Sequence, residues 1–331
     1  MKILICEDEF VSRRKLEKII HTLGYEFLVA ENGRQAYHLW ENERPELIIC
    51  DWIMPEMTGI ELCQKVRAEE GSQYTYIIMV SAKQDTTDIV KAIDAGADDF
   101  ISKPYVIEEL AVRIRAGQRS RMFQTKDIVI FSLAKLAESR DTETGNHLER
   151  IRHFSRLLAE ELAQMENNPF KINTLYIENI FLTSPLHDIG KVGIPDSILL
   201  KPARLTAEER QAMTEHCRIG YNTLHDALEK YPHTDYLQMG AEIALHHHEK
   251  FDGRGYPEQL KGNDIPLAAR IVALADVYDA LTSKRTYKDP YSHDTAREMI
   301  RAEKNVHFDP LVVDAFLRCE QRFAEIRQQF T

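Results

Sequence analysis

Over the first third of the chain, short apolar runs alternate with segments in which apolar residues recur at helical spacing. The apolar runs predict buried strands, and the 3.6-residue periodicity between them predicts helices. Regular alternation of the two predicts a doubly wound α/β domain with a five-stranded parallel sheet. The expected strands are 2–6, 26–30, 47–50, 77–80 and 100–101, and the expected helices are 12–23, 33–43, 59–70, 86–95 and one beginning at 106.

The rest of the chain has a different pattern, with long segments of helical periodicity and few runs of β-branched residues. We expect residues 141 to 331 to form an all-α domain. The length of 331 residues allows two domains that each bury a core. Histidine is also divided unevenly, because only two of the 13 histidines precede residue 122. We therefore expect domains at 1–122 and 123–331.

The segment from about 106 to 139 connects the two expected domains. It has no proline and one glycine, Gly117, and this composition predicts a nearly unbroken, stiff helix. Its apolar residues could pack on a second copy of the chain, although four arginines interrupt the apolar stripe (Arg113, Arg115, Arg119 and Arg121). We expect a homodimer through this connector, with a solvated connector as the alternative.

Composition excludes several classes of protein. A formal net charge of −11 argues against DNA binding and against general attraction to an anionic membrane. The five cysteines are scattered without C-x-x-C spacing, which argues against a disulfide framework and against zinc held by cysteines. The apolar N-terminus is too short for a signal sequence, and no run approaches the length of a membrane span. We expect a cytoplasmic protein without membrane insertion.

Polar residues follow the expected strands of the first domain. In doubly wound sheets, working residues lie beyond the carboxyl ends of the strands. Three carboxylates meeting there would repel one another unless a hard cation such as Mg²⁺ joined them. A solvated acidic rim would not account for the hydroxyl and the lysine at matching positions, and a dinucleotide-binding sheet would need a G-x-G-x-x-G motif that is missing. The polar residues that follow the expected strands are Glu7, Asp8, Asp51, Ser81 and Lys103.

The segment CDWIMPEMTG at 50–59 resembles the phosphorylation-site motif of bacterial response-regulator receiver domains. The resemblance implies a flavodoxin-like fold, phosphorylation of Asp51 and a cognate sensor histidine kinase as partner. It assigns Mg²⁺ binding to Glu7, Asp8 and Asp51, and the phosphorylation-dependent switch to Ser81, Phe100 and Lys103. Glu7 is a departure, because the family more often has aspartate there.

In the second half, His, Asp and Glu recur on expected helices. His187-Asp188 offers a neutral nitrogen and an anionic oxygen, which iron, manganese and zinc accept. Each cluster alone could belong to a capped or solvated helix that binds no metal. Together the clusters favour a polynuclear metal site. Because neighbouring side chains on a helix diverge by about 100°, we expect His247 and His248 to bind two different ions. The other candidates are Glu143 with His147, Glu215-His216 and Asp276.

Three motifs of this half resemble the HD-GYP phosphodiesterases, over nearly all of 128–320: HDIGK at 187–191, HHE at 247–249 and GYP at 255–257. The resemblance implies an HD-type fold and hydrolysis of cyclic di-GMP to pGpG or GMP by a metal-bound water. It implies a di- or trinuclear centre of iron or manganese, in which Asp188 bridges ions and Lys191 contacts the scissile phosphate. The implied ligands are Glu143, His147, His187, Asp188, His216, His247, His248 and Asp276.

The same resemblance implies contacts to the nucleotide from five residues, and an acidic protein needs local cations for a doubly anionic substrate. The family more often has proline where this chain has Thr286. His246 receives no role and is expected at the surface or around the ligands. The implied contacts are Asp141, Lys191, Tyr256, Arg285 and Lys288.

Two other functions remain open. The protein could bind a cyclic dinucleotide without turnover, or it could be an HD-type phosphohydrolase of nucleoside phosphates. Every metal-ligand position that the HD-GYP resemblance implies is filled in this sequence, which argues against binding without turnover. The GYP element argues against a phosphohydrolase of nucleoside phosphates. We expect phosphorylation of Asp51 to regulate the hydrolase.

Overall fold

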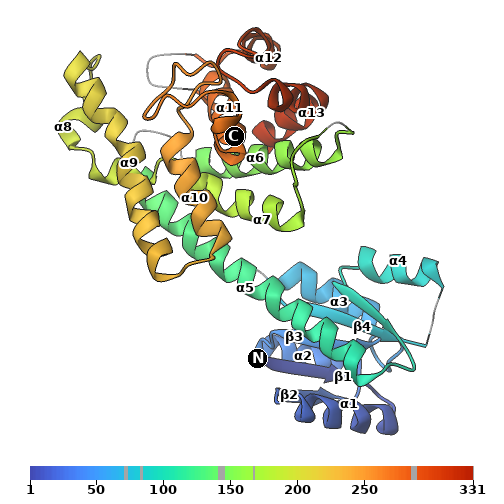
Figure 1. The fold of residues 1–331 in the computed structure, drawn as a ribbon. Helices are drawn as coiled ribbons and strands as arrows, with labels where there is room; N and C mark the ends of the chain where they lie inside the picture. Colours follow the sequence, from blue (N-terminus) through green and yellow to red (C-terminus); the bar gives the residue numbers. More distant parts are fainter. Residues whose placement is uncertain (71–73, 83–84, 141–145, 167, 285–288, 331) are drawn as a thin grey trace. The chain divides into compact units, whose positions relative to one another are not determined.

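The computed structural model describes residues 1–70, 74–82, 85–140, 146–166, 168–284 and 289–330. The chain divides into two compact units, Met1–Thr125 and Lys126–Thr331 (Figure 1). Each unit is described by itself below. None of the helices within the described ranges is long and apolar enough to cross a membrane.

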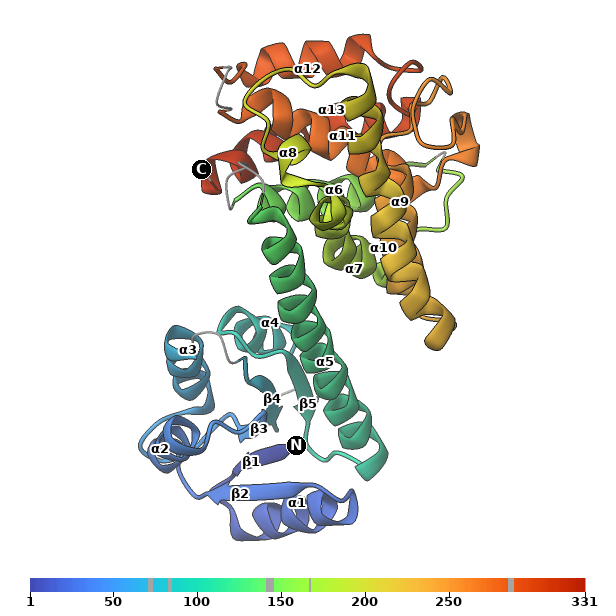
Figure 2. The same cartoon turned by 90° about the vertical axis from the view of Figure 1, so that its left-hand side faces the viewer.

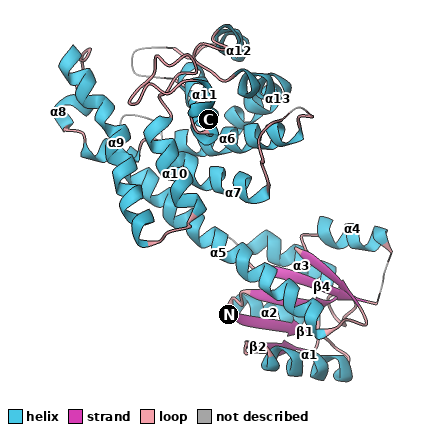
Figure 3. Ribbon diagram, in the orientation of Figure 1, coloured by secondary structure: helices cyan, strands magenta, loops and turns pink. Residues whose placement is uncertain are grey.

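The first unit is a parallel five-stranded sheet with helices on both faces, so the predicted fold class is confirmed (Figure 3). The strand order is β2-β1-β3-β4-β5, and the bounds of every strand are within one residue of the prediction. The elements are β1 (Lys2–Cys6), α1 (Phe10–Thr22), β2 (Glu26–Ala30), α2 (Gly33–Glu43), β3 (Leu47–Asp51), α3 (Gly59–Glu69), β4 (Tyr76–Ser81), α4 (Thr86–Asp94), β5 (Asp99–Ser102) and the start of α5 (Ile107–Glu138).

Alternate residues of the central strands build two cores, one on each face of the sheet. Leu4 and Ile48 face α2 and α3, whereas Ile3 and Ile49 face α1 and α5. Helix α5 can lie close to the sheet because of Gly117, where an added Cβ would come within 2.7 Å of the Tyr76 ring.

The named elements of the second unit are all helical (Figure 2). Its core lies between α6, α11 and α13, where the rings of Phe154 and Phe323 stack with centroids 4.4 Å apart. After the end of α5 the elements are α6 (His147–Gln164), α7 (Thr174–Thr183), η1 (Ser184–Leu186), η2 (Ile189–Gly193), α8 (Asp196–Leu199), α9 (Ala207–Lys230), α10 (Asp235–His246), η3 (Gly262–Asp264), α11 (Leu267–Thr282), α12 (His293–Ala302) and α13 (Pro310–Gln329).

Candidate metal centre and phosphoacceptor site

His187 and Asp188 lie between two short 3₁₀ turns, η1 and η2, so the expectation that an α-helix carries them was wrong. The turn η2 lies directly against α9. A Cβ added at Gly190 would be 1.9 Å from the carbonyl oxygen of His216, so only glycine fits there. This close approach brings the Asp188 carboxylate to the imidazole of His216, with Oδ1 3.3 Å from Nε2.

Three histidines around Asp188 are oriented by the same kind of hydrogen bond. Their Nδ1 atoms donate hydrogen bonds to backbone carbonyls, at 2.9 Å for His187, 2.7 Å for His216 and 3.0 Å for His247. A neutral imidazole with a proton on Nδ1 has a lone pair on Nε2. These Nε2 atoms lie 3.3, 3.3 and 3.7 Å from the Asp188 carboxylate. Lone pairs therefore face a carboxylate, and a cation between them would relieve the repulsion.

Electrostatics and hydrogen bonding both fit a cation at this place. Burial lowers the pKa of His216 to about 4, which keeps its ring neutral. Although burial opposes ionisation of Asp188, the neighbouring ammonium group of Lys191 holds the pKa of this carboxyl well below its ordinary value. Around Asp188, Nε2 of His187, Nε2 of His247 and Oδ1 of Asp188 are buried and have no hydrogen-bond partner among the described residues. Convergent nitrogen and carboxylate acceptors of this kind suit borderline divalent ions.

The candidate ligand atoms form two groups, each with all its atoms within 4.8 Å of one another. One group is His147, His187 and Asp276, and the other is His216, Cys217, His247 and His248. Asp188 faces His187 of the first group and both His216 and His247 of the second. Its carboxylate therefore lies where it could bridge two ions.

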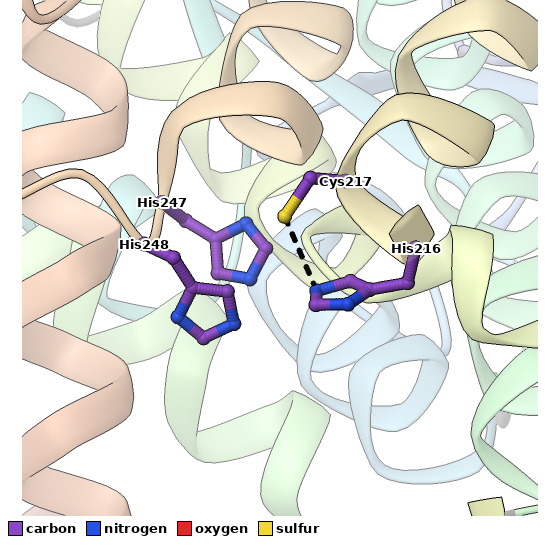
Figure 4. Close-up of side chains that lie close together, drawn as sticks. All are labelled: His216, Cys217, His247 and His248. Atoms are coloured by element: carbon purple, nitrogen blue, oxygen red, sulfur yellow. Dashed lines mark hydrogen bonds between the residues drawn. The ribbon is translucent and has the colours of Figure 1, made fainter. Parts of the chain in front are cut away.

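The expectation that His247 and His248 diverge was wrong. Helix α10 ends at His246, so the angle of about 100° between helical neighbours does not apply to the next two residues. The rings of His247 and His248 lie 4.0 Å apart between centroids and face the same group (Figure 4).

Cys217 is a member of this group that the sequence analysis missed. Its Sγ lies 3.4 Å from Nε2 of His216 (Figure 4). Burial raises the pKa of its thiol above the ordinary value. The absence of C-x-x-C spacing had argued against zinc held by cysteines, but that rule concerns sites made of cysteine pairs.

Asp279 is a second residue that the sequence analysis missed. It is buried on α11, and its Oδ2 accepts a hydrogen bond from Nδ1 of His147 at 2.7 Å. Arg150 donates to both oxygens of the same carboxylate. A carboxylate behind a histidine fixes the ring and directs Nε2 towards a metal. The signal was present in the sequence, because Asp279 follows Asp276 by three residues and therefore shares its face of α11.

We predict that Asp279→Asn weakens metal binding by about 10- to 100-fold, because His147 loses its charged partner. A chelator-competition titration measures this affinity. Asp294→Asn is the matched control, since the Asp294 side chain is 80% exposed. Unchanged affinity in a folded Asp279→Asn protein would show that the carboxylate does not orient His147.

Other expected site residues lie beside the two groups. Nζ of Lys191 is 2.8 Å from Oδ2 of Asp188. The Tyr256 ring lies 4.7 Å from that of His248, between centroids. His246 is buried rather than at the surface, and its ring bonds to the carbonyl of Glu242 and the carboxylate of Glu258. Asp141, Glu143, Arg285 and Lys288 lie outside the described residues.

In the first unit, the expected phosphoacceptor residues come together. Glu7, Asp8 and Asp51 have oxygens within 4.8 Å of one another. Nζ of Lys103 lies 2.7 Å from carboxylate oxygens of both Glu7 and Asp51. Lys103 therefore offsets part of the acidic charge, and one buried Glu7 oxygen still has no hydrogen-bond partner among the described residues. These acceptors fit a hard cation such as Mg²⁺.

Ser81 and Phe100, the other expected switch residues, are both buried. The Phe100 ring meets Trp52 edge-on, with centroids 6.4 Å apart. Trp52 directly follows Asp51, so the aromatic contact begins one residue from the expected phosphoacceptor.

We predict that Glu7→Gln changes how the stability of the first unit depends on pH. Burial, the largest influence, raises the pKa of Glu7 from 4.5 to about 7. Between these values the folded form holds a proton that the unfolded form releases. The stability that Glu7 contributes is therefore complete below pH 4.5 and is lost as the pH rises through 7. Glutamine does not titrate. The free energy of unfolding of Glu7→Gln, relative to that of the wild type, should therefore rise by up to about 3 kcal/mol as the pH goes from 4.5 to 7.

Urea unfolding without divalent ions tests this prediction. Both tryptophans of the chain, Trp40 and Trp52, lie in the first unit, so their fluorescence follows that unit alone. Glu41→Gln is the control, because Glu41 is exposed. Parallel pH profiles for wild type and Glu7→Gln would contradict the raised pKa.

Comparison with known proteins gives a family for each part of the chain. The family model described as HD domain matches residues 132–312, and the response regulator receiver domain model matches residues 3–115. A probable cyclic di-GMP phosphodiesterase of Vibrio cholerae is 40% identical, over 92% of this chain and 75% of its own length. A cyclic di-GMP phosphodiesterase of Thermotoga maritima is 36% identical, over 98% of this chain and 92% of its own length.

A third relative has both parts in its name. The cyclic di-GMP phosphodiesterase response regulator RpfG of Xanthomonas campestris is 35% identical, over 100% of this chain and 91% of its own length. These matches confirm both resemblances that the motifs indicated. The chain belongs to the family of response regulators in which a receiver domain is followed by an HD domain.

Proposed function

We propose that this protein is a metal-dependent phosphodiesterase that hydrolyses cyclic di-GMP to pGpG or GMP under control of phosphorylation at Asp51. The main support is the set of buried acceptor atoms around Asp188, of which Nε2 of His187, Nε2 of His247 and Oδ1 of Asp188 have no hydrogen-bond partner among the described residues. The names of the full-length relatives support the substrate. We also propose 1–122 and 123–331 as the functional domains, joined by the connector at about 106–139.

The metal centre of this proposal has a role for each ligand. The two groups and Asp188 would hold two ions, and Glu143 would be available for a third. Iron or manganese is the proposed metal, and Mg²⁺ is proposed for Glu7, Asp8 and Asp51. Divalent ions supply Lewis-acid stabilisation of the phosphoryl oxygens and make water a stronger acid near neutral pH.

The chain itself provides orientation and charge. The three Nδ1–carbonyl bonds hold the imidazoles so that they need not reorganise during the reaction. Lys191 carries positive charge beside Asp188, where a phosphoryl oxygen of the substrate would develop negative charge. Tyr256 lies next to His248 and can contact the nucleotide. Asp141, Arg285 and Lys288 remain proposed substrate contacts.

Turnover assays with metal analysis test this function. The purified full chain, loaded with iron or manganese, is incubated with cyclic di-GMP, and pGpG and GMP are separated by chromatography. Cyclic di-GMP binding without turnover by the loaded protein would indicate a sensor. Turnover of nucleoside phosphates in preference to cyclic di-GMP would indicate a different HD-type phosphohydrolase.

We propose a homodimer through the connector, supported by an apolar face on α5. Val129, Leu133 and Leu136 are spaced by four and three residues, so they share one face of the helix. Their relative exposures are 53%, 52% and 67%. Residues with this spacing are typical of a helix that pairs with a second helix.

We predict that Leu133→Glu shifts the protein from dimer to monomer, because a buried charge in the pairing face has no partner. Light scattering after size-exclusion chromatography measures the mass. Leu175→Glu is the control, since Leu175 is 50% exposed on α7. A wild-type monomer, or a Leu133→Glu dimer, would contradict the pairing.

A further inference from the structure

Cys217 lies in the metal-binding part of the second unit although this family's ligand pattern has no role for it. Its side chain is fully buried on α9, next to His216. Its Sγ, one nitrogen of His247 and one nitrogen of His248 all lie within 4.8 Å of one another and of His216 (Figure 4). The thiol therefore stands among three imidazoles.

The distance between sulfur and nitrogen is that of two ligands on one ion. Metal–sulfur and metal–nitrogen bonds of about 2.3 and 2.1 Å, at angles of 90° to 110°, separate the two ligand atoms by about 3.1 to 3.6 Å. Sγ of Cys217 and Nε2 of His216 are 3.4 Å apart. An ion can therefore reach both atoms without rearrangement of α9.

A second observation concerns His247. His247 is only 2% exposed, its Nδ1 donates to the carbonyl of Ile243, and its Nε2 has no hydrogen-bond partner in the part of the chain that the structure describes. If Cys217 were only a packing residue, its thiol hydrogen could satisfy Nε2 of His216 but would leave Nε2 of His247 unpaired. A cation at the centre of the group satisfies both nitrogens and the sulfur.

We propose that Cys217 is a sulfur ligand of the ion held by His216, His247 and His248. The proposal rests on the metal centre of the proposed function. As the sulfur–metal bond forms, the thiol proton leaves to solvent and the electron pair of the S–H bond becomes the donor pair. Because thiolate is a soft ligand, it should favour zinc or ferrous iron over manganese at this position.

Reconstitution with Co²⁺ tests this directly, because thiolate bonded to Co²⁺ gives a charge-transfer absorption band in the near ultraviolet that imidazole and carboxylate do not give. We expect the band in the wild type and its loss in Cys217→Ser, with circular dichroism showing that the variant is folded. Cys319→Ser is the matched control. Cys319 is also buried in the second unit, but its Sγ bonds to the carbonyl of Ala315. The control should keep the band.

The outcomes separate this inference from the proposed function. A wild type that binds Co²⁺ and hydrolyses cyclic di-GMP without the band would overturn the sulfur ligand alone. Persistence of the band in Cys217→Ser would overturn it as well. Failure of the wild type to bind Co²⁺, zinc, iron or manganese would overturn the metal centre and the inference together. A competition series should also show that Cys217→Ser lowers the preference for zinc over manganese, whereas Cys319→Ser leaves it unchanged.

Discussion

Asp188→Ala should remove both bound metal and phosphodiesterase turnover. The carboxylate lies within 3.7 Å of the Nε2 atoms of His187, His216 and His247, so it is the anion that faces both ligand groups. Without it, two cations would repel each other across a set of neutral imidazoles. Loss of several kcal/mol of transition-state stabilisation corresponds to at least about a 10³-fold decrease in kcat/KM.

Metal analysis and turnover of cyclic di-GMP, measured on the same preparation, check this prediction. Asp226→Ala is the control, because Asp226 is an exposed carboxylate on α9. If Asp188→Ala retained full metal content and wild-type turnover, the site would have to lie elsewhere. Loss of turnover with full metal content would assign Asp188 a catalytic role without a bridging one.

Interrupting α5 should uncouple turnover from the state of Asp51. Ala134 and Glu138 of α5 line the same pocket as His187 and Lys191. Just beyond the helix, Arg140 donates to the backbone carbonyls of Val192 and Ile194 and pairs with Asp196. Arg140, two residues beyond the end of α5, therefore contacts the segment that follows Lys191.

Phosphorylation replaces the single negative charge of the Asp51 carboxylate by a phosphoryl group that carries up to about two, beside Lys103. A continuous helix can transmit a resulting rotation or change in helix pairing, whereas a flexible segment would absorb it. Gly117 is a poor place for an insertion, because it packs against Tyr76 and Leu47. Four glycines after Thr125, at the division between the units, leave that packing intact.

The measured quantity is the ratio of turnover with and without beryllofluoride, which mimics the phosphoryl group. We expect a ratio different from one in the wild type and equal to one in the glycine insertion. A helix-forming insertion of seven residues is the matched control, because it nearly preserves the helical phase and should keep the response. A response that survives the glycines would contradict transmission through α5, and a ratio of one in the wild type would leave the receiver without control over turnover.

The sequence alone determined the elements that local patterns specify. Strands β1 to β5 were predicted from apolar runs. The predicted bounds agree with the structure because a buried strand consists of consecutive apolar residues, which the sequence shows directly. Neighbouring residues also specify where several helices begin, as the capping box of Thr58 and Glu61 does for α3. The approach of Glu7, Asp51 and Lys103 could also be predicted, since parallel strands bring their carboxyl ends to one edge.

Only the tertiary structure decided how the candidate metal-binding residues of the second unit are arranged. The 3₁₀ turns around Asp188 depend on the contact of Gly190 with α9, and the shared direction of His247 and His248 depends on where α10 ends. Asp279 meets His147 across 132 positions of the chain, and Cys217 acquires neighbours from the two residues that follow α10. Periodicity shows which face of a helix is buried, but it does not show which remote side chain meets that face, because the packing of several helices decides the contact.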